Sequence, residues 1–405
     1  MTTEQFKQMN DILEELAKLL DITKEEFNTI TKSYEAVGTY LAEGSSPLKV
    51  FSPSIHPQGS FLLGTVVRPI SDEDDLDIDL VCELQNKPQH WVQYNLKKAV
   101  GDRLKESNLY KQKLDKEGKR CWTLKYGENK YHLDVLPSLV CSNYRDIVNH
   151  YFLINKTKNP DELAIHITDN TRSDYYTECD ESKWMVSNPF GYAEWFLTSA
   201  QAAYRQERTF SMEAKIDPVP KFSHGKYALQ RVVQLLKRHR DKMFNGDENK
   251  PISIIITTLA TRVYNEEKNI YLALRHVVEN MGSRIEDRNG IKWVPNPVNR
   301  SENFADRWPQ NPQKQQYFYK WLEQLQKDVN RLEASFGKGL QEVKKVLEDM
   351  FGESVSAKTY ENYSKLLLKQ RKTGSMRMTS TGILGTSGIV KVAAHNFYGT
   401  ETKES

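Results

Sequence analysis

Two aspartates one residue apart, Asp77 and Asp79, lie at the start of an apolar run. Alternate side chains of a β-strand share a face, so both carboxylates are expected to point the same way, with Ile78 and Leu80 on the other face. Two carboxylates held side by side repel each other unless a cation lies between them. Magnesium takes oxygen ligands and commonly combines one or two carboxylates with substrate phosphates. The pair therefore predicts metal-dependent chemistry on a nucleotide.

Two further features fit this chemistry. Upstream, the backbone N–H groups and the hydroxyl of Gly59 and Ser60 could bind phosphate. Downstream, Asp134 lies in the apolar segment YHLDVLPS, where an aspartate is costly unless it is paired or metal-bound. We expect Asp77, Asp79 and Asp134 to hold two divalent ions, Mg²⁺ or Mn²⁺, about 3.5–4 Å apart. Asp134, nearest to the attacking ribose hydroxyl, is the expected proton acceptor.

The register of the metal ligands has an alternative, because the acidic stretch 72–75 precedes the pair. Asp75 would share their face if the strand began earlier. We favour Asp77 and Asp79 because apolar residues flank both, and we expect 72–75 to be a solvated loop. A calcium-binding EF-hand is excluded, since counting from Asp75 places Leu80 and Asn86 where such a loop needs glycine and glutamate.

The elements that must position these residues form an α+β unit. Thr23 and Glu26 make a capping box at the start of a second helix, after an interruption at 21–23. Periodicity and turn signals predict, in order, helices within 4–43, a connector at 44–58, strands at 78–84, 120–126 and 131–139, and a helix at 89–106 between the first two strands. We expect the strands to form a mixed sheet.

From about residue 190 the pattern becomes mostly helical. The predicted helices are 189–206, 225–244, 252–264, 272–281 and 312–350. The last residues are rich in Gly, Ser and Thr and predict an irregular tail. We therefore expect a catalytic lobe with the N-terminal helices at 1–188, a helical lobe closing the nucleotide cleft at 189–372, and the tail at 373–405.

The overall composition narrows the class of protein. A net charge of +3 over 405 residues does not by itself indicate a nucleic-acid-binding protein. The basic segment 358–391 could bind a polyanion or simply be a solvated face. No apolar run approaches the roughly 18–20 residues of a membrane span, and the N-terminus lacks the pattern of a signal peptide. The four cysteines are widely spaced, which argues against a zinc ribbon or a disulfide framework and favours the cytoplasm.

The motifs also resemble those of a known family. The string QGSFLLGTVVRP, then DDLDIDLV and HLDVLP, is similar to the core of the DNA polymerase β-like nucleotidyltransferases, and more narrowly to the bacterial cGAS/DncV-like nucleotidyltransferases (CD-NTases). The resemblance implies a bilobal α+β fold, with a mixed-sheet core and a helical C-terminal lobe. It assigns a triphosphate-contacting lysine to Lys237, in LQRVVQLLKRHRDKMF, and a phosphate-contacting serine to Ser253. It covers about residues 58–260.

The family implies a function and partners. The implied reaction is the synthesis of cyclic di- or trinucleotide second messengers from NTPs (ATP, GTP or both) with Mg²⁺. The implied role is in anti-phage (CBASS) operons, where the product acts on a downstream effector. An operon-encoded regulator or a conjugating protein could act at the C-terminus, although the terminal Lys-Glu-Ser argues against conjugation. The alternatives are an enzyme that makes linear oligonucleotides or modifies RNA or protein, and a silent nucleotide- or RNA-binding regulator. The intact aspartates argue against the silent alternative.

Four residues near the motifs have competing interpretations. Lys237, in a basic cluster, could lie on a solvated helix face, and Ser253 could be a helix N-cap. Arg68 could contact a phosphate or pair with Asp72. His132 could orient the third aspartate or be a half-buried histidine satisfied by other groups.

Overall fold

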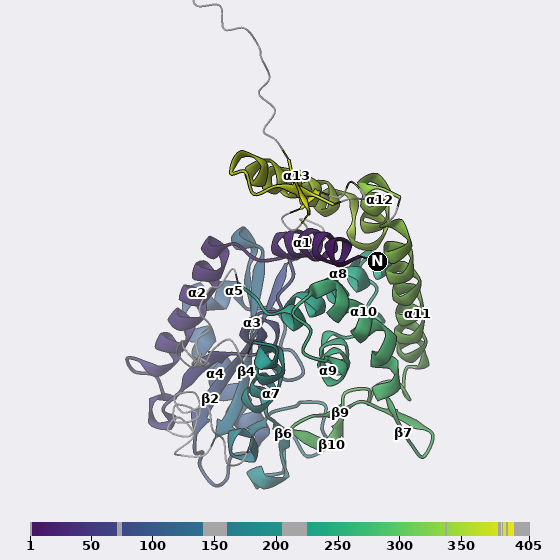
Figure 1. The fold of residues 1–405 in the computed structure, drawn as a ribbon. Coiled ribbons are helices and arrows are strands. Elements are labelled where there is room, and N and C mark those ends of the chain that lie inside the picture. The colour runs from purple at the N-terminus through teal and green to yellow at the C-terminus, as the bar shows by residue number, and fades with distance from the viewer. Residues whose placement is uncertain are drawn as a thin grey trace, which may run out of the picture.

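The structure is a computed structural model of the 405-residue chain. It describes residues 2–70, 75–140, 160–204, 225–336, 338–379, 382, 384–385 and 388–392. Asp72 with most of the acidic stretch, Cys141 and the C-terminal residues from 393 lie outside these residues. Within them the chain forms a lobe built around a sheet and a lobe built of helices, which lie side by side (Figure 1).

The first lobe contains a six-stranded mixed sheet. Its strands are β1 (Ser54–Pro57), β2 (Leu76–Gln85), β3 (Trp122–Tyr126), β4 (Tyr131–Val140), β5 (Ile165–Ile167) and β6 (Met185–Ser187). The order is β1-β2-β4-β5-β6, and β3 pairs with the first half of β4. β2 and β4 run parallel and the other pairs are antiparallel, which confirms the predicted mixed sheet.

Helices cover the apolar side of this sheet. Ile78 and Leu80 of β2 are buried in one cluster with Tyr34 and Val37 of α2 and with Leu96 of α4. The opposite side of β2 carries the aspartates and faces the second lobe. The helices of this lobe are α2 (Lys24–Ala42), α3 (Gly59–Leu63), α4 (Gln93–Glu106) and α5 (Asn108–Lys113).

The second lobe is a group of helices packed around α8, which is buried along almost its whole length. Its helices are α7 (Pro189–Ala202), α8 (Ala228–Phe244), α9 (Ser253–Val263), α10 (Ile270–Asn280), α11 (Pro312–Ser335), α12 (Leu340–Phe351) and α13 (Glu353–Lys372). Two small hairpins follow α10, namely β7 (Glu286–Arg288) with β8 (Ile291–Trp293) and β9 (Pro295–Asn296) with β10 (Asn299–Asn303). Among the described residues, none of the helices combines the length and apolar character needed to cross a bilayer.

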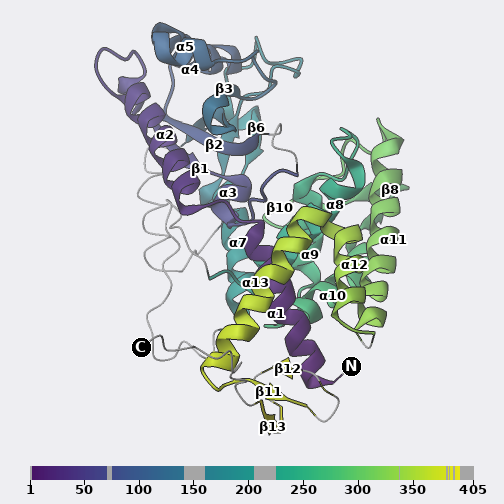
Figure 2. The ribbon, with the colours of Figure 1, turned by 90° about the horizontal axis from the view of Figure 1, so that it is seen from above.

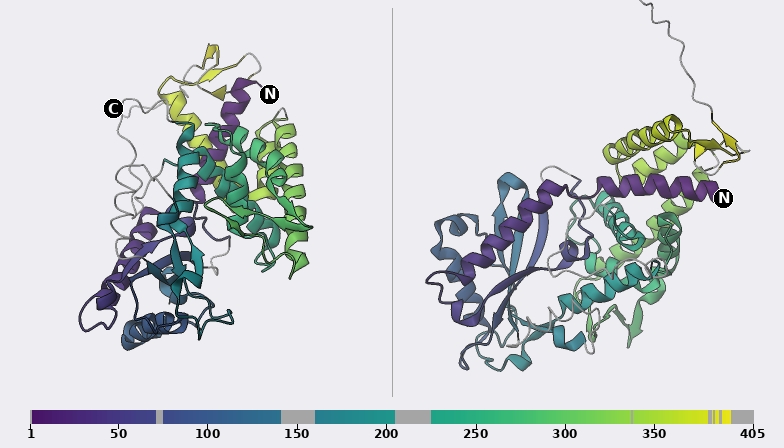
Figure 3. Two further views of the ribbon diagram at one scale, coloured as in Figure 1. Left: turned by 90° about the horizontal axis from the view of Figure 1, so that it is seen from below. Right: turned by 60° about the vertical axis from the view of Figure 1, so that its left-hand side comes forward.

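The first helix of the chain belongs to this second lobe. α1 (Thr3–Leu19) lies along α13, as Figures 2 and 3 show, and its buried face joins the core of the helical lobe. The chain then crosses to α2 through residues 20–23. At this crossing Asp21 accepts hydrogen bonds from Arg231 and Gln234 of α8, each at 2.8 Å. The capping box of Thr23 and Glu26 begins α2 as predicted. The boundaries 1–188 and 189–372 stay predictions.

Three sequence expectations were wrong in detail. The connector 44–58 contains β1, which pairs with β2. The helix predicted over 312–350 breaks before α12, because Gly339 adopts φ +98°, which a helix cannot accommodate. The tail predicted as irregular holds a three-stranded sheet, whose strands of two residues each are too short to give a sequence pattern: β11 (Arg377–Met378), β12 (Leu384–Gly385) and β13 (Val390–Lys391).

Candidate active site

The register of β2 against β4 assembles the acidic residues. Asp77 lies opposite His132, and Asp79 lies opposite Asp134. Ligand atoms of Asp77, His132 and Asp134 all lie within 4.8 Å of one another. β2 begins at Leu76, so Asp75 is outside the strand, although it lines the cavity onto which Asp77 and Asp79 open. The structure thus brings together the three aspartates that the sequence predicted, with a histidine that it had not assigned as a ligand.

Hydrogen bonds hold two of these carboxylates. Thr123 of β3, paired with Asp134 across the sheet, donates its hydroxyl to Asp134 Oδ1. His132 Nε2 lies 3.2 Å from Asp77 Oδ1, so this histidine contacts Asp77 and not the third aspartate. Sequence reasoning missed Thr123, because only the β3–β4 register places it beside Asp134.

Asp79 lies against a glycine at the start of α3. Gly59 has φ +56°, and a Cβ at this position would lie 2.3 Å from Asp79 Oδ2. The backbone N–H of Gln58 donates to the carbonyl of Asp79 at 2.9 Å. Gly59 and Ser60 therefore lie in the first turn of a short helix, and the absence of a side chain at Gly59 lets the backbone approach the carboxylate.

The carboxylates at this site repel one another. Burial, followed by the nearby Asp77 and Asp134, raises the pKa of Asp79 to about 7. A divalent ion would remove the repulsion that contributes to this shift. The carboxylate oxygens suit a hard cation such as Mg²⁺ or Mn²⁺, so the donor set fits the expected metal.

The carboxylates open on a cavity of about 730 Å³ between the lobes. Lys237 lines it and is buried, and its Nζ donates to the carbonyl of Thr65 at 3.0 Å and to the Thr65 hydroxyl at 3.1 Å. The interpretation of Lys237 as a solvated residue is therefore wrong. Burial lowers the pKa of Lys237 to about 7. The predicted residues Gly59, Ser60 and Ser253 line the same cavity.

Ser253 is hydrogen-bonded to an arginine that also lines this cavity and that sequence reasoning had missed. Arg240 Nη1 donates to Ser253 Oγ at 2.8 Å and to the carbonyl of Pro251 at 3.1 Å. Ile252 occupies the N-cap position of α9, so the interpretation of Ser253 as an N-cap is wrong. Lys250 adds a further cation to the wall. No motif marks these two cations, because they are brought to the cavity by the turn between α8 and α9.

Arg68 contacts a residue that the sequence analysis had not considered, and its expected partner Asp72 lies outside the described residues. Its Nη2 lies 2.6 Å from both carboxylate oxygens of Glu26 at the start of α2. This pair joins the segment after α3 to α2, which supports the wall of the cavity.

A second cavity of about 450 Å³ adjoins the first. Gly59 and Asp79 line both cavities, whereas Asp134 lines only the second of these two. Its remaining wall comes from distant segments and includes Arg120, Tyr192, Asn296, Glu302 and Phe304. We refer to the first as the cationic cavity and to the second as the Asp134 cavity.

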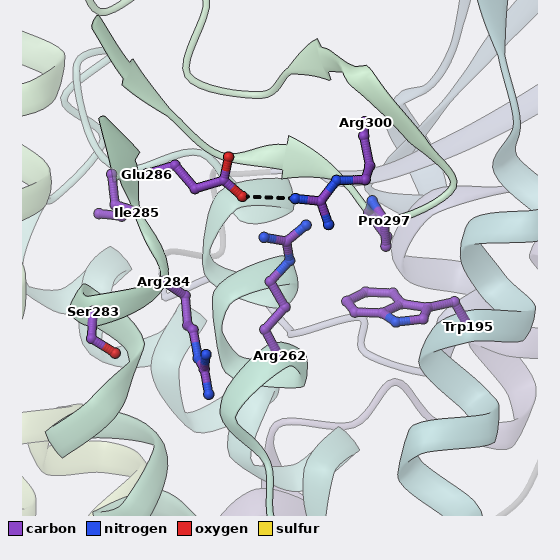
Figure 4. Close-up of a pocket in the computed structure, with 8 residues that line it drawn as sticks. All are labelled: Trp195, Arg262, Ser283, Arg284, Ile285, Glu286, Pro297 and Arg300. Atoms are coloured by element: carbon purple, nitrogen blue, oxygen red, sulfur yellow. Dashed lines mark hydrogen bonds and ion pairs between the residues drawn. The ribbon is translucent and has the colours of Figure 1, made fainter. Parts of the chain in front are cut away.

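A third cavity, of about 540 Å³, is rich in arginine (Figure 4). α7, α9 and the β9–β10 hairpin contribute to this cavity and to the Asp134 cavity. In Figure 4 Arg262 points toward the ion pair of Arg300 and Glu286, which is 3.1 Å long. Arg262 Nη2 also donates to the carbonyl of Pro295 at 2.9 Å, which fixes the start of the hairpin.

Comparison with known proteins supports the family that the motifs resemble. The family described as "Cyclic GMP-AMP synthase DncV-like, nucleotidyltransferase domain" matches residues 53–137, which carry Gly59, Ser60 and all three aspartates. The chain is 28% identical to a c-di-GMP synthase of Roseivirga ehrenbergii, over 98% of this chain and 99% of that protein. These matches support a cGAS/DncV-like nucleotidyltransferase. This nucleotidyltransferase is also 23% identical to the cyclic dinucleotide synthase CdnG of Bradyrhizobium diazoefficiens, over 92% of this chain and 88% of that one.

Solved structures share the fold of this nucleotidyltransferase. The structure of Bradyrhizobium diazoefficiens CdnG in complex with GTP superposes with a TM-score of 0.64 at 21% identity, over 88% of this chain and 99% of that one. The GTP-bound form of Vibrio cholerae DncV gives 0.51 at 15% identity, over 88% and 89%. The predicted family and the predicted α+β fold are confirmed.

Proposed function

We propose that this nucleotidyltransferase joins two nucleoside triphosphates into a cyclic dinucleotide. The observation that carries the proposal is the position of the carboxylates, where the cationic cavity meets the Asp134 cavity. The cationic cavity, with Lys237, Arg240 and Lys250, suits the triphosphate of the donor nucleotide. The Asp134 cavity then takes the acceptor nucleotide, whose ribose hydroxyl lies at Asp134.

The residues have distinct roles in this proposal. Asp77, Asp79 and Asp134 hold the divalent ions, and Ser60, Lys237 and Ser253 donate to phosphate oxygens. When bound, two Mg²⁺ or Mn²⁺ ions would lower the pKa of the attacking hydroxyl and neutralise charge on the leaving pyrophosphate. Asp134 accepts the proton of the hydroxyl as its oxygen bonds to the α-phosphorus and the bond to pyrophosphate breaks. The linear product then returns its own triphosphate to the cationic cavity, and a second transfer closes the ring.

Two observations favour cyclisation over the alternatives. The chain matches, over nearly its whole length, relatives that are named for cyclic dinucleotide synthesis. All three carboxylates are present and converge, which argues against a silent binding protein.

Mass spectrometry of the product tests the proposal. We expect the chain, supplied with an equal mixture of four NTPs and Mg²⁺, to release pyrophosphate and form a product that resists phosphatase. A cyclic dinucleotide has no terminal phosphate, whereas a linear one loses phosphate groups under the same treatment. If phosphatase removes terminal phosphates from all of the product, the enzyme makes a linear oligonucleotide instead.

We also propose that the product acts in anti-phage signalling in the cytoplasm, as in the family that the motifs resemble. We expect bacteria carrying the gene in its operon to restrict phage plating. The restriction should disappear in the Asp77→Asn variant, because the signal is no longer made. Equal plating on both strains would contradict this role while leaving the chemistry intact.

A further inference from the structure

The wall of the Asp134 cavity holds a fixed carboxylate far from the metal ligands in sequence. Glu302 of β10 is half-buried in this wall, and its Oε2 accepts a hydrogen bond from Asn296 Nδ2 at 2.8 Å. Asn296 is buried and is itself held, because its Oδ1 accepts from the N–H of Val298 at 3.0 Å. Burial raises the pKa of Glu302. The carboxylate is therefore held by the β9–β10 hairpin in the wall of the Asp134 cavity.

A guanidinium approaches the same cavity from the other lobe. Arg120, just before β3, lines it, and its Nε donates to Asp169 Oδ2 at 2.7 Å. Asp169 is buried and also accepts from the Thr171 hydroxyl at 2.6 Å, so this end of the arginine is fixed. Guanidinium has five N–H donors in a planar fork, and this pair with Asp169 leaves donors for a ligand. Arg120 is close enough to Glu302 to lower its pKa.

The hydrogen-bond acceptor Glu302 and the hydrogen-bond donor Arg120, both held in one pocket, match only some nucleotide bases. Guanine presents two N–H donors side by side, N1–H and N2–H, which a carboxylate can accept together. Its O6 and N7 are acceptors that arginine commonly binds in a bidentate manner. Adenine would instead direct the lone pair of N1 at Glu302, which costs a hydrogen bond and adds repulsion.

The rest of the cavity is shaped for one nucleoside. Tyr192 and Phe304 give it an aromatic wall, with ring centroids 6.1 Å apart at 74°. Asp134 and Asp79 lie in the same 450 Å³ space. A purine held at Glu302 can therefore direct its ribose toward the carboxylates.

We propose that Glu302 and Arg120 select guanosine as the acceptor nucleotide of this enzyme. This inference rests on the proposed function for the role of the cavity, but the base preference itself can be measured without turnover. It adds residues that lie outside the catalytic motifs and come from the helical lobe and from the segment before β3.

Replacing the hydrogen-bond acceptor Glu302 tests whether it selects guanine. Glu302→Gln replaces two acceptors by one acceptor and one donor, a pattern that suits adenine. We expect wild type to use GTP alone at least about tenfold faster than ATP alone, and the variant to shift this ratio toward ATP by about ten- to a hundredfold. Arg120→Lys keeps the charge beside Asp169 but loses the fork, and should weaken guanine use without favouring adenine. Glu286→Gln, in the arginine-rich cavity, is the matched control and should leave the ratio unchanged.

Binding of GMP and AMP, measured by calorimetry without metal, separates this inference from the proposed function. Wild type should bind GMP at least about tenfold more tightly than AMP, and Glu302→Gln should lose that preference. Thermal melting checks that each variant is folded. Unchanged GTP:ATP and GMP:AMP ratios in folded Glu302→Gln would overturn the guanine assignment even if pyrophosphate release is normal. Failure of wild type to release pyrophosphate from any NTP would overturn the proposed function, and the GMP:AMP ratios would still decide the base preference.

Discussion

The double variant Asp77→Asn, Asp79→Asn is expected to lose pyrophosphate release by about 10³-fold or more, yet to unfold at a higher temperature than wild type in metal-free buffer at pH 8. Activity falls because amides are poor ligands for the hard cations that supply several kcal/mol of transition-state stabilisation. Stability rises because the carboxylates repel one another in the metal-free site. Burial, Asp77 and Asp134 together raise the pKa of Asp79 to about 7.

The sign of the pH dependence follows from this shift. A carboxyl group whose pKa is higher in the folded state binds its proton more tightly there, so the free energy of unfolding falls as pH rises from about 4 through 7. At pH 8 the full penalty is present, and we expect its removal to add about 1–3 kcal/mol to the free energy of unfolding. At pH 5 Asp79 is protonated in the folded protein, so the gain should nearly vanish.

Thermal melts with and without Mg²⁺ check this prediction. Mg²⁺ at pH 8 should raise the melting temperature of wild type, because the ion binds only the folded protein, and should leave the double variant unchanged. Asp115→Asn is a suitable control, since Asp115 is an exposed partner of Lys125 and lies outside the cavities described above. Retained activity in the double variant, or a lower melting temperature at pH 8, would contradict the metal site.

Gly59→Ala is expected to reduce pyrophosphate release by about a hundredfold in a folded protein. The added Cβ would lie 2.3 Å from Asp79 Oδ2, so the carboxylate or the start of α3 must move. A displacement of about 1 Å at a catalytic group can reduce the rate by about 10²-fold. Steady-state rates and melting curves measure the two effects separately.

Gly44→Ala is the matched control for this variant. Gly44 has φ +69°, close to the +56° of Gly59, so alanine imposes a similar backbone strain of about 1 kcal/mol at each position. A Cβ at Gly44 meets no atom within 4 Å. If Gly59→Ala retains activity within a few-fold of Gly44→Ala, then strain and not the contact with Asp79 explains its effect. Combining Gly59→Ala with Asp79→Asn should give less than additive destabilisation, because both act on one contact.

The sequence predicted the parts of the site that depend on local pattern. Strand alternation placed Asp77 and Asp79 on one face, and the cost of a carboxylate in an apolar segment pointed to Asp134. The motif resemblance added Lys237 and Ser253. What the sequence could not supply is the register between strands far apart in the chain. The contact of His132 with Asp77 depends on the β2–β4 register, so no local pattern could reveal it.

The walls of the cavities were hidden for the same reason. Glu302 and Arg120 lie in a short hairpin and in a loop, and nearly half the length of the chain separates them. Neither has a periodicity or a motif that indicates a ligand. Arg240 lies in a helix that the sequence predicted, but its hydrogen bond to Ser253 could not be predicted, because it depends on the conformation of the turn between α8 and α9. Sequence reasoning therefore recovered the reacting end of the site and missed the surfaces that would choose its substrates.

The packing of α1 against α13 has a mechanical consequence. The chain starts in the helical lobe, crosses to the sheet lobe at residues 20–23 and returns after β6, so two separate connections join the lobes. Hydrogen bonds from Arg231 and Gln234 to Asp21 hold the first connection against α8. Two connections at separate points allow one lobe to rotate about the line between them, but they restrict its translation and twisting relative to the other lobe. Cleft opening should follow one such rotation, and a cut near residue 188 would leave the helical half without the helix that completes its core.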